Sequence, residues 1–473
     1  MSEQVVIPLT PVPGAQHAGN GPAYDAPYRW FIAASLALAI GGGFLLSLLL
    51  PLARAEKSAW GSGIRWQALI QAHGQLQLIG FGGLFVMGMS LRLMPSFSRR
   101  PLAFRALVPA LIPIIVASLI LRSIAEPWGS GAIRDVALLA SAVLLLTGGA
   151  AFAAIVCGTL VHRESRAGAT GYYFVLGSIG FCVGAALNLI QVIEIVRDGL
   201  PIAPVSKETA QVFVQQYGFL VMFLSGVAGR AVPTFTGSKP RAVPSRAAAL
   251  TLGAGVALFT GAMLWITYGS ASSTAARVGD IGQLLTDLAF VMSVWLSGAL
   301  WPSKNRVAAA SQTAFWLVRS AYAWLLAAAV LTAWYGARAF VDGSLPDTFE
   351  LDAIRHILTI GVLTMMVVGM SLLIVPEFAG RRLQHPDERW LIWAMIGALN
   401  VASALRLWPA VEGVNWLTST RYWPIAAAAS LASGVIIVFA AMFAQSYLEQ
   451  RKPGWGAPKT PGAPRGKRGE ATA

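Results

Sequence analysis

Apolar runs long enough to cross a lipid bilayer recur along the whole chain of 473 residues. Two of them are WFIAASLALAIGGGFLLSLLLPLA, from Trp30, and ASLASGVIIVFAAMFA, from Ala429. A helix of about 20 apolar residues spans roughly 30 Å of hydrocarbon. Only 12% of the residues are charged, about half of the ~25% that is usual in soluble domains. The sequence therefore predicts an all-α polytopic membrane protein whose main partner is the lipid bilayer, and it argues against a soluble enzyme.

Charged residues, prolines and glycines divide the chain into about twelve predicted spans. The spans begin near residues 30, 69, 106, 136, 171, 209, 247, 281, 312, 353, 390 and 424. Together they form one transmembrane domain over residues 30–450. Polar, Pro/Gly-rich composition predicts a disordered N-terminal tail over residues 1–29 and a basic disordered C-terminal tail over residues 451–473. No cleavable signal peptide is evident at the N-terminus.

The formal net charge of +14 is distributed in short clusters rather than in one basic patch. Most clusters follow the even-numbered spans, as the positive-inside rule predicts for cytoplasmic loops. Both chain termini are therefore expected on the cytoplasmic side. The loop with Arg54, Lys57 and Arg65 breaks the rule, whereas the acidic loop around Asp342 and Glu350 follows it. This distribution argues against a nucleic-acid-binding surface.

One pattern, G-x7-G-x6-P-x-F, occurs three times and falls on spans 2, 6 and 10. The copies are Gly80, Gly88, Pro95, Phe97; Gly218, Gly226, Pro233, Phe235; and Gly361, Gly369, Pro376, Phe378. The spacing of four spans predicts three parallel four-helix repeats, approximately residues 30–165, 166–305 and 306–450. Parallel repeats of this kind indicate a ring with pseudo-threefold symmetry about the membrane normal.

The repeated residues themselves are interpreted as packing positions rather than as a site. Glycines let helices approach closely inside a membrane, where lipid supplies no hydrophobic drive for association. The repeated proline is expected to end its helix at the cytoplasmic edge, because a proline lacks the backbone N–H that continues a helix.

The five histidines divide into two groups by position. His17, His162 and His385 lie in the N-terminal tail or in polar loops and are interpreted as solvated surface residues. His73 and His356 lie near the start of spans 2 and 10 inside apolar runs, 22 and 20 residues before the repeat proline. This places them at depths that differ by about 3 Å. An ionisable side chain inside a span is a candidate functional residue. The alternative is two hydrogen-bonded core or interfacial histidines.

Two histidines suit a haem better than a bare metal ion. A copper or zinc centre made only of protein ligands usually takes three or four side chains, and no third intramembrane histidine is present. Haem iron needs only one or two axial ligands, and histidine is a common one. His73 lies seven residues before Gly80 and shares its helix face, whereas His356 lies five residues before Gly361, about 140° away around the helix axis. The two helices must therefore present different faces to a shared ligand.

Other polar residues are candidates for a supporting role at this centre. Gln77 shares a helix face with His73, while Gln211 and Gln215 take related places on span 6. Arg406 and Arg421 flank the predicted outer loop between spans 11 and 12, where they can pair with haem propionates or snorkel to the interface. The two cysteines, Cys157 and Cys182, show no disulfide or zinc-site spacing. Arg319 lies inside span 9 without an evident partner, and Glu194 is the clearest embedded acid.

The histidine positions and several segments resemble known families. Three four-helix units with histidines on spans 2 and 10 resemble subunit I of haem-copper oxidases. The segments VPTFTG (Val232–Gly237) and RHILTIGVLTMMVVGMS (Arg355–Ser371) resemble the NnrS family, membrane haem proteins linked to bacterial nitric-oxide and nitrosative-stress defence. The segment AHGQLQLIGFGGLFVMGMSLRLMP (Ala72–Pro95) resembles both the oxidase subunit and the NnrS family equally. The resemblance implies a bacterial inner-membrane protein with His73 and His356 as axial haem ligands, and nitric oxide or another diatomic molecule as its ligand.

The departures from the oxidase pattern limit what the resemblance implies. Oxidases carry further histidines on spans 6, 7 and 10 for copper and the second haem, but spans 6 and 7 contain none here. Oxygen or nitric-oxide reduction by that mechanism therefore lacks its site, and turnover is an open question. Copper is a second candidate metal, with no ligand set that can be assigned. No motif identifies an electron donor.

Two other functions compete with haem binding. Twelve spans and internal repeats also suit a secondary transporter of a small solute without haem. Such proteins usually carry acids near the bilayer midplane and inverted repeats, whereas the repeats here are parallel. A redox-inactive assembly partner in a respiratory complex is the third alternative, although no residue argues for it directly.

Overall fold

A computed structural model describes residues 26–58, 61–162, 165–236, 242–270, 272–301, 312–343, 348–379, 383, 388–411 and 422–449, and these residues form helices and short connections without a β-strand. The first unit contains α1 (Ala26–Leu38), the π-helix η1 (Ala39–Gly43), α2 (Phe44–Ala55), α3 (Gly63–Gln75), the π-helix η2 (Leu76–Gly83), α4 (Leu84–Ser98), the short 3₁₀ helix η3 (Arg105–Leu107), α5 (Val108–Trp128) and α6 (Gly131–Leu160).

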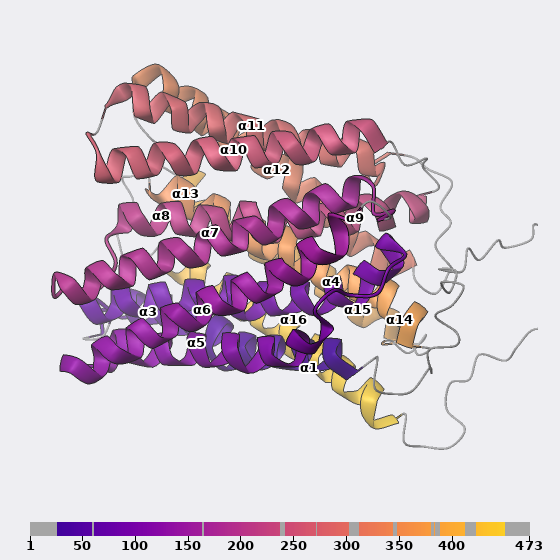
Figure 1. Ribbon diagram of the computed structural model, residues 1–473, viewed down its shortest axis with the longest axis horizontal. Helices are drawn as coiled ribbons and strands as arrows, with labels where there is room; N and C mark the ends of the chain where they lie inside the picture. The colour runs from indigo at the N-terminus through magenta and orange to yellow at the C-terminus, as the bar shows by residue number, and fades with distance from the viewer. Residues whose placement is uncertain are drawn as a thin grey trace, which may run out of the picture.

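The second and third units repeat this order. The second contains α7 (Ala169–Arg197), α8 (Val205–Phe213), the π-helix η4 (Val214–Val221), α9 (Met222–Thr236), α10 (Ala242–Tyr268) and α11 (Ser273–Ser297). The third contains α12 (Gln312–Asp342), α13 (Thr348–His356), the π-helix η6 (Ile357–Thr364), α14 (Met365–Ala379), α15 (Arg389–Val411) and α16 (Tyr422–Glu449). The elements lie side by side as one long bundle (Figure 1).

The predicted membrane-spanning architecture is confirmed. Within the described residues, eleven continuous helices are long and apolar enough to cross a bilayer. The twelfth, α11, has the length of a span but is less apolar, since it carries Asp280, Gln283 and Asp287. The helices of the bundle run roughly parallel to its long axis, as spans through a bilayer would (Figure 1).

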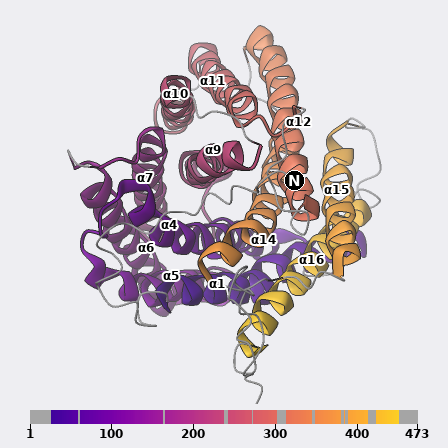
Figure 2. The ribbon, with the colours of Figure 1, turned by 90° about the vertical axis from the view of Figure 1, so that its right-hand side faces the viewer.

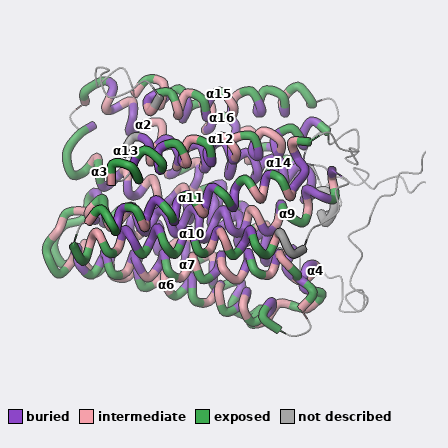
Figure 3. The backbone as a smooth tube through the Cα atoms, turned by 90° about the horizontal axis from the view of Figure 1, so that it is seen from above, coloured by how far each residue is buried: buried purple, intermediate pink, exposed green. Residues whose placement is uncertain are grey.

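The three helices that carry the repeated pattern form the centre of the bundle. In the most apolar 18-residue stretch of each of these three helices, 78–94% of the residues are buried within the protein, whereas the corresponding share is 33–50% in the other candidate spans. Viewed from the end, α4, α9 and α14 lie inside a ring made by the other helices (Figure 2). Exposed residues concentrate on the outer faces of that ring (Figure 3). The protein therefore encloses its repeat helices and offers its outer helices to lipid.

Each repeat helix contains a π-helical segment in the same register. Each of η2, η4 and η6 is eight residues long, and the first repeat glycine, Gly80, Gly218 or Gly361, stands fifth in it. A 15-residue α-helix follows in every case. Because π-helices are rare and often occur at functional sites, this threefold coincidence supports the repeat and marks the middle of each central helix as a special region.

The second repeat glycine packs on the first helix of its own unit in all three copies. A Cβ atom added at Gly88 would lie 2.5 Å from Cβ of Phe31 in α1. At Gly226 it would lie 2.9 Å from Cβ of Tyr173 in α7, and at Gly369 it would lie 2.9 Å from Cβ of Leu317 in α12. The predicted packing role of the glycines is therefore confirmed, since there is no room for a side chain at these crossings.

The expectation that the repeat proline ends its helix was wrong. Pro95 and Pro233 lie inside α4 and α9, which continue to Ser98 and Thr236, three residues further on. The third helix also ends three residues after Pro376, at Ala379. A proline removes only one backbone donor and leaves the turn after it free to continue. The helix therefore completes most of one more turn before it stops.

Among the described glycines, Gly180 lies at the closest approach of two helices, and replacing it should destabilise the bundle. A Cβ at Gly180 would lie 2.2 Å from the carbonyl oxygen of Gly218, and this backbone cannot swing aside as a side chain can. We expect Gly180→Ala to cost roughly 1–3 kcal/mol of stability, as overpacking does. The measurement is thermal unfolding in detergent. Gly397→Ala is the control, because no atom lies within 4 Å of a Cβ there; equal stability of the two variants would contradict the crossing.

Candidate functional site

The structure brings His73 and His356 together, although 283 positions separate them in the chain. His73 lies on α3, three residues before η2, and His356 ends α13 directly before η6. Their ring centroids are 6.4 Å apart and their planes differ by 6°. Two imidazoles that bind one metal ion from opposite sides at a metal–nitrogen distance of about 2 Å would have centroids roughly 6 Å apart. The observed separation matches this value.

A backbone carbonyl fixes the ring of His73. Its Nδ1 lies 2.8 Å from the carbonyl oxygen of Gly43, the last residue of η1. Since a carbonyl oxygen can only accept, Nδ1 carries the proton and donates. The remaining nitrogen, Nε2, therefore holds the lone pair that can bind a metal. Gln77 lies against the same glycine, because a Cβ added at Gly43 would come within 3.0 Å of its side chain. His73 and Gln77 share a face, as expected.

His356 is oriented in the same way on its own helix. Its Nδ1 donates to the carbonyl oxygen of Asp352, 2.8 Å away, and lies 3.3 Å from the Asp352 carboxylate. Arg406 of α15 donates to Nε2 of His356 at 2.8 Å and reaches the Asp352 carboxylate at 3.2 Å. Both histidines thus have a proton on Nδ1 and a lone pair on Nε2. A metal-binding histidine usually donates its other ring nitrogen to a carbonyl or carboxylate in this manner.

These side chains fit a haem iron. At the observed ring separation, the Nε2 atoms of His73 and, once Arg406 has left it, of His356 would supply two ligands, and the porphyrin would bring its own four nitrogens. Within the described ranges, no group of three or more His, Cys, Asp or Glu residues is arranged to hold a bare metal ion. The guanidinium of Arg406 and a metal ion cannot both contact the lone pair on Nε2 of His356, so Arg406 would have to move when a metal binds there. The Asp352 carboxylate, 3.2 Å from Arg406, would remain its partner.

The structure also places most of the other residues that the sequence analysis singled out. Arg406 belongs to the site, as the contacts above show. Arg421, His17 and His385 lie outside the described residues. His162 is exposed in the connection after α6, as expected for a surface histidine. Cys157 and Cys182 are free thiols on α6 and α7. Arg319, for which the sequence indicates no partner, stacks on Phe315 and Trp316 with its guanidinium carbon 5.2 and 4.8 Å from the ring centroids.

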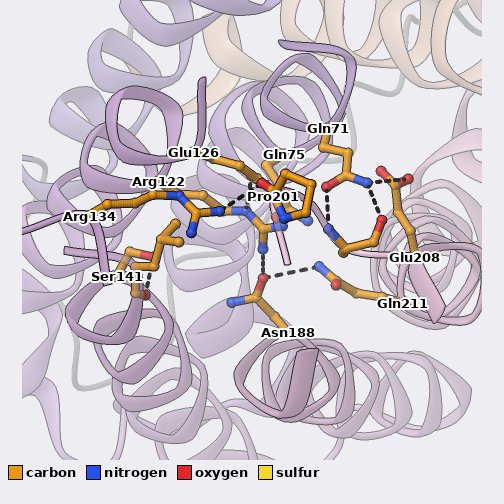
Figure 4. A network of polar contacts seen from close by, with 12 residues as sticks. Gln71, Gln75, Arg122, Glu126, Arg134, Ser141, Asn188, Pro201, Glu208 and Gln211 are labelled. Atoms are coloured by element: carbon orange, nitrogen blue, oxygen red, sulfur yellow. Dashed lines mark hydrogen bonds and ion pairs between the residues drawn. The ribbon is translucent and has the colours of Figure 1, made fainter. Parts of the chain in front are cut away.

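Gln211 and Gln215 belong to a second polar cluster, between the first and second units. Gln215 exchanges hydrogen bonds with Gln75 of α3 at 3.4–3.5 Å, and Gln211 donates to Asn188 of α7 at 3.5 Å. Figure 4 shows Gln75, Gln211 and Asn188 near Arg122, which also contacts Asn188. The middle repeat therefore uses its glutamines to join helices, and no hydrogen bond given by the structure links them to the two histidines.

A buried ion pair, which the sequence analysis missed, anchors this cluster. Arg122 donates to Glu126 at 3.0 Å on α5, and the two side chains are 6% and 0% exposed. Gln71 of α3 donates to the backbone carbonyl of Ala203 at 2.8 Å and to the Glu208 carboxylate at 3.2 Å (Figure 4). The spacing of Arg122 and Glu126, i to i+4, is a signal that could have identified the pair.

Two buried acids on α11 were also missed. Asp280 is 1% exposed and Asp287 is 4% exposed, although Glu194 was expected to be the clearest embedded acid. Glu194 instead lies at the end of α7, where Lys207 donates to it at 2.6 Å. Asp280 and Asp287 are seven residues apart, close to two helical turns. That spacing could have indicated one buried face.

Comparison with known proteins identifies the family to which the chain belongs. A search of curated proteins found no match. The NnrS protein family matches residues 22–451, which include every described helix. The match covers the three repeats and both histidines of the candidate centre. The chain therefore belongs to the NnrS family.

Proposed function

We propose that this protein is a haem-binding protein of the bacterial cytoplasmic membrane in which His73 and His356 are the axial ligands. The observation that carries the proposal is the 6.4 Å separation of two nearly parallel imidazole rings. Both rings have their Nδ1 atoms held by backbone carbonyls. Membership of the NnrS family supports a role in the response to nitric oxide or nitrosative stress. The distribution of basic loops supports cytoplasmic termini.

Each residue at the centre has a distinct task in this proposal. A bound haem would supply an iron that can exchange electrons, or bind a diatomic ligand such as nitric oxide in place of one of the two histidines. His73 and His356 hold it, while the carbonyls of Gly43 and Asp352 keep the imidazoles in the correct tautomer. Arg406, once displaced from His356, supplies a cation for a haem carboxylate and remains near Asp352. Gln77 is the remaining polar side chain on the face of His73.

The test is the absorption spectrum of the purified full-length protein in detergent, from haem-replete cells. We expect a Soret band, a low-spin spectrum and, in pyridine, a haemochrome that gives about one haem per chain. Adding nitric oxide to the anaerobically reduced protein tests the ligand, since binding shifts the Soret band. A colourless, fully folded preparation would contradict haem binding. A coloured preparation without any response to nitric oxide would contradict only the ligand.

The buried acids Asp280 and Asp287 favour a second candidate, a secondary transporter. Acids embedded in the membrane often serve in proton or ion coupling. The parallel repeats and the paired histidines are not explained by that function. A colourless preparation that carries a solute into proteoliposomes would support the transporter, so the same purified protein separates the two functions.

Asp352 should support the centre without binding the metal. It contacts His356 and Arg406, so Asp352→Asn removes the charge that orients both. We expect this variant to hold haem about 10–100-fold more weakly, as is usual when a residue that orients a metal ligand is changed. Haem transfer to apomyoglobin measures the loss. Asp342→Asn, at the exposed end of α12, is the matched control. Equal haem retention in both variants would contradict the role of Asp352.

A further inference from the structure

The strongest unexplained feature outside the histidine centre is the pair of acids on α11. Asp280 and Asp287 are both more than nine-tenths buried. Neither oxygen of the Asp280 carboxyl has a hydrogen-bond partner, and the Oδ2 atom of Asp287 has none. Within the described residues, no lysine, arginine or histidine forms an ion pair with either side chain. Buried carboxyl groups without a partner are rare and need an explanation.

Close packing of α10 on α11 shields this face. A Cβ added at Gly255 of α10 would lie 2.7 Å from the carbonyl oxygen of Gly282, and one at Gly282 would lie 2.5 Å from the backbone nitrogen of Phe259. The backbones therefore touch beside Gln283, and α10 contributes only apolar or small groups there. Water and lipid headgroups are excluded from this side, so Asp287 cannot be neutralised by bulk solvent through it.

Asp287 has a polar neighbour in Gln283 of the same helix. Gln283 donates to Oδ1 of Asp287 at 3.2 Å and to the hydroxyl of Thr286 at 2.8 Å. Gln283 also lines a small cavity together with Thr332 of α12, Gln216 and Tyr217 of η4, and Arg355 of α13. Gln216 donates to the carbonyl of Arg355 at 2.8 Å, and its Oε1 has no partner. Phe213, Phe259, Leu351 and Ile354 complete the lining, and the space is large enough for about one ordered water molecule.

This cavity lies between the second unit and α13, the helix that carries His356. Arg355 directly precedes His356 in α13, so one end of the cavity adjoins the helix that carries a proposed haem ligand. The groups that face the region are Gln283 and Thr286 on α11, Thr332 on α12, Gln216 and Tyr217 on η4, and Arg355 on α13. Of these, only Arg355 carries a charge at neutral pH, and it forms no ion pair with Asp287.

A carboxylate in such a place must be neutralised. The cost of burying an isolated anion in a medium of low dielectric constant is prohibitive, and the group takes up a proton or a cation instead. With one amide donor and no cation, a proton is the simplest partner. Embedded acids in helical membrane proteins serve as proton relays for this reason.

We propose that Asp287 is a proton-binding site whose proton exchanges with water that enters from the cavity lined by its hydrogen-bond partner Gln283 together with Gln216 and Arg355. The step is the transfer of one proton between the carboxyl oxygen of Asp287 and a water molecule, with no other bond changed. Asp280, about two turns earlier on the same helix, is a second protonated carboxyl. The coupling of this site to the centre, through the charge on the iron, rests on the proposed function.

Infrared difference spectroscopy of the full-length protein tests the site without haem. The carbonyl band of a protonated carboxylic acid shifts to lower frequency when D₂O replaces H₂O. We expect wild type to show this shift, and Asp287→Asn to lose that component while Asp198→Asn, on the exposed connection after α7, keeps it. Gln283→Leu should slow the exchange at least tenfold, because it removes the amide beside Asp287. Thermal unfolding verifies that the variants are folded.

Each result decides between the possibilities. A wild-type protein without an exchangeable carboxylic-acid band overturns the proposal, as does an Asp287→Asn variant with an unchanged band. Exchange in Gln283→Leu as fast as in wild type overturns the cavity as the route. Where haem is bound, its midpoint potential should fall as pH rises in wild type and fall less steeply in Asp287→Asn. Equal slopes overturn the coupling alone, and absent haem overturns only the proposed function.

Discussion

Replacing either histidine of the centre should remove the low-spin haem spectrum. His73→Ala and His356→Ala each delete one of two imidazoles whose rings lie 6.4 Å apart. An iron with a single protein ligand becomes five-coordinate or takes up water, and its spectrum becomes high-spin. We expect loss of the low-spin bands in both single variants and loss of bound haem in the double variant. Absorption spectra and the pyridine haemochrome of the purified proteins measure both effects.

His162→Ala is the matched control for these variants. His162 is exposed in the connection after α6, so its removal should leave the spectrum unchanged. If His162→Ala lost haem while His73→Ala and His356→Ala retained a low-spin spectrum, the assignment of the ligands would be wrong. Retention by only one of the two centre variants would limit the protein to a single axial histidine.

Breaking the buried ion pair of α5 should produce the largest loss of stability. Glu126→Gln leaves the guanidinium of Arg122 without its carboxylate in a place where both side chains are almost fully buried. Removing one partner of such a pair typically costs roughly 3–5 kcal/mol, because the remaining charge is left uncompensated. Arg122 also contacts Asn188 of α7, so the damage extends to the neighbouring helix. Thermal unfolding in detergent should show a strongly reduced midpoint for Glu126→Gln and for Arg122→Met.

Two comparisons separate the lost charge from a general defect. The double variant Arg122→Met/Glu126→Leu should recover most of the stability, since an apolar pair can replace a buried ion pair. The Arg197–Asp198 pair is the exposed counterpart, with side chains 68% and 43% exposed. There the hydrogen bond from Arg197 lowers the pKa of Asp198, yet Asp198→Asn should leave the unfolding midpoint unchanged because water screens exposed pairs. Equal losses in Asp198→Asn and Glu126→Gln would contradict the argument.

The architecture was predictable because apolar length and repetition are local properties of the chain. The glycines of the repeat were expected to mark close helix crossings, and Gly88 lies in one. The depth of His73 and His356 followed from counting residues along regular helices. The span formed by α11 was also predicted, although its acids make it less apolar than the eleven other spans. A sequence pattern that repeats at a fixed spacing can be recognised without knowing which distant segments are in contact.

The details of the centre depended on contacts that no local pattern contains. The π-helical segments change the direction of side chains along the central helices, and the sequence has no feature that predicts them here. Gly43, which fixes His73, belongs to such a segment in a different helix. Arg406 was predicted to pair with haem propionates or to lie at the membrane interface, and the fold brings it from α15 onto His356 itself. Each of these is a meeting of segments far apart in the chain.

The sequence by itself indicated an all-helical membrane protein with three repeats and predicted a common depth for two histidines, because hydrophobic length, charge and repetition act along the chain. Only the tertiary structure decided which groups meet: the imidazoles with their carbonyl partners, Arg122 with Asn188, and Gln283 of α11 with Asp287 and a small cavity. The physical reason is that hydrogen bonding and desolvation depend on distances between side chains, and the packing of all twelve helices sets those distances.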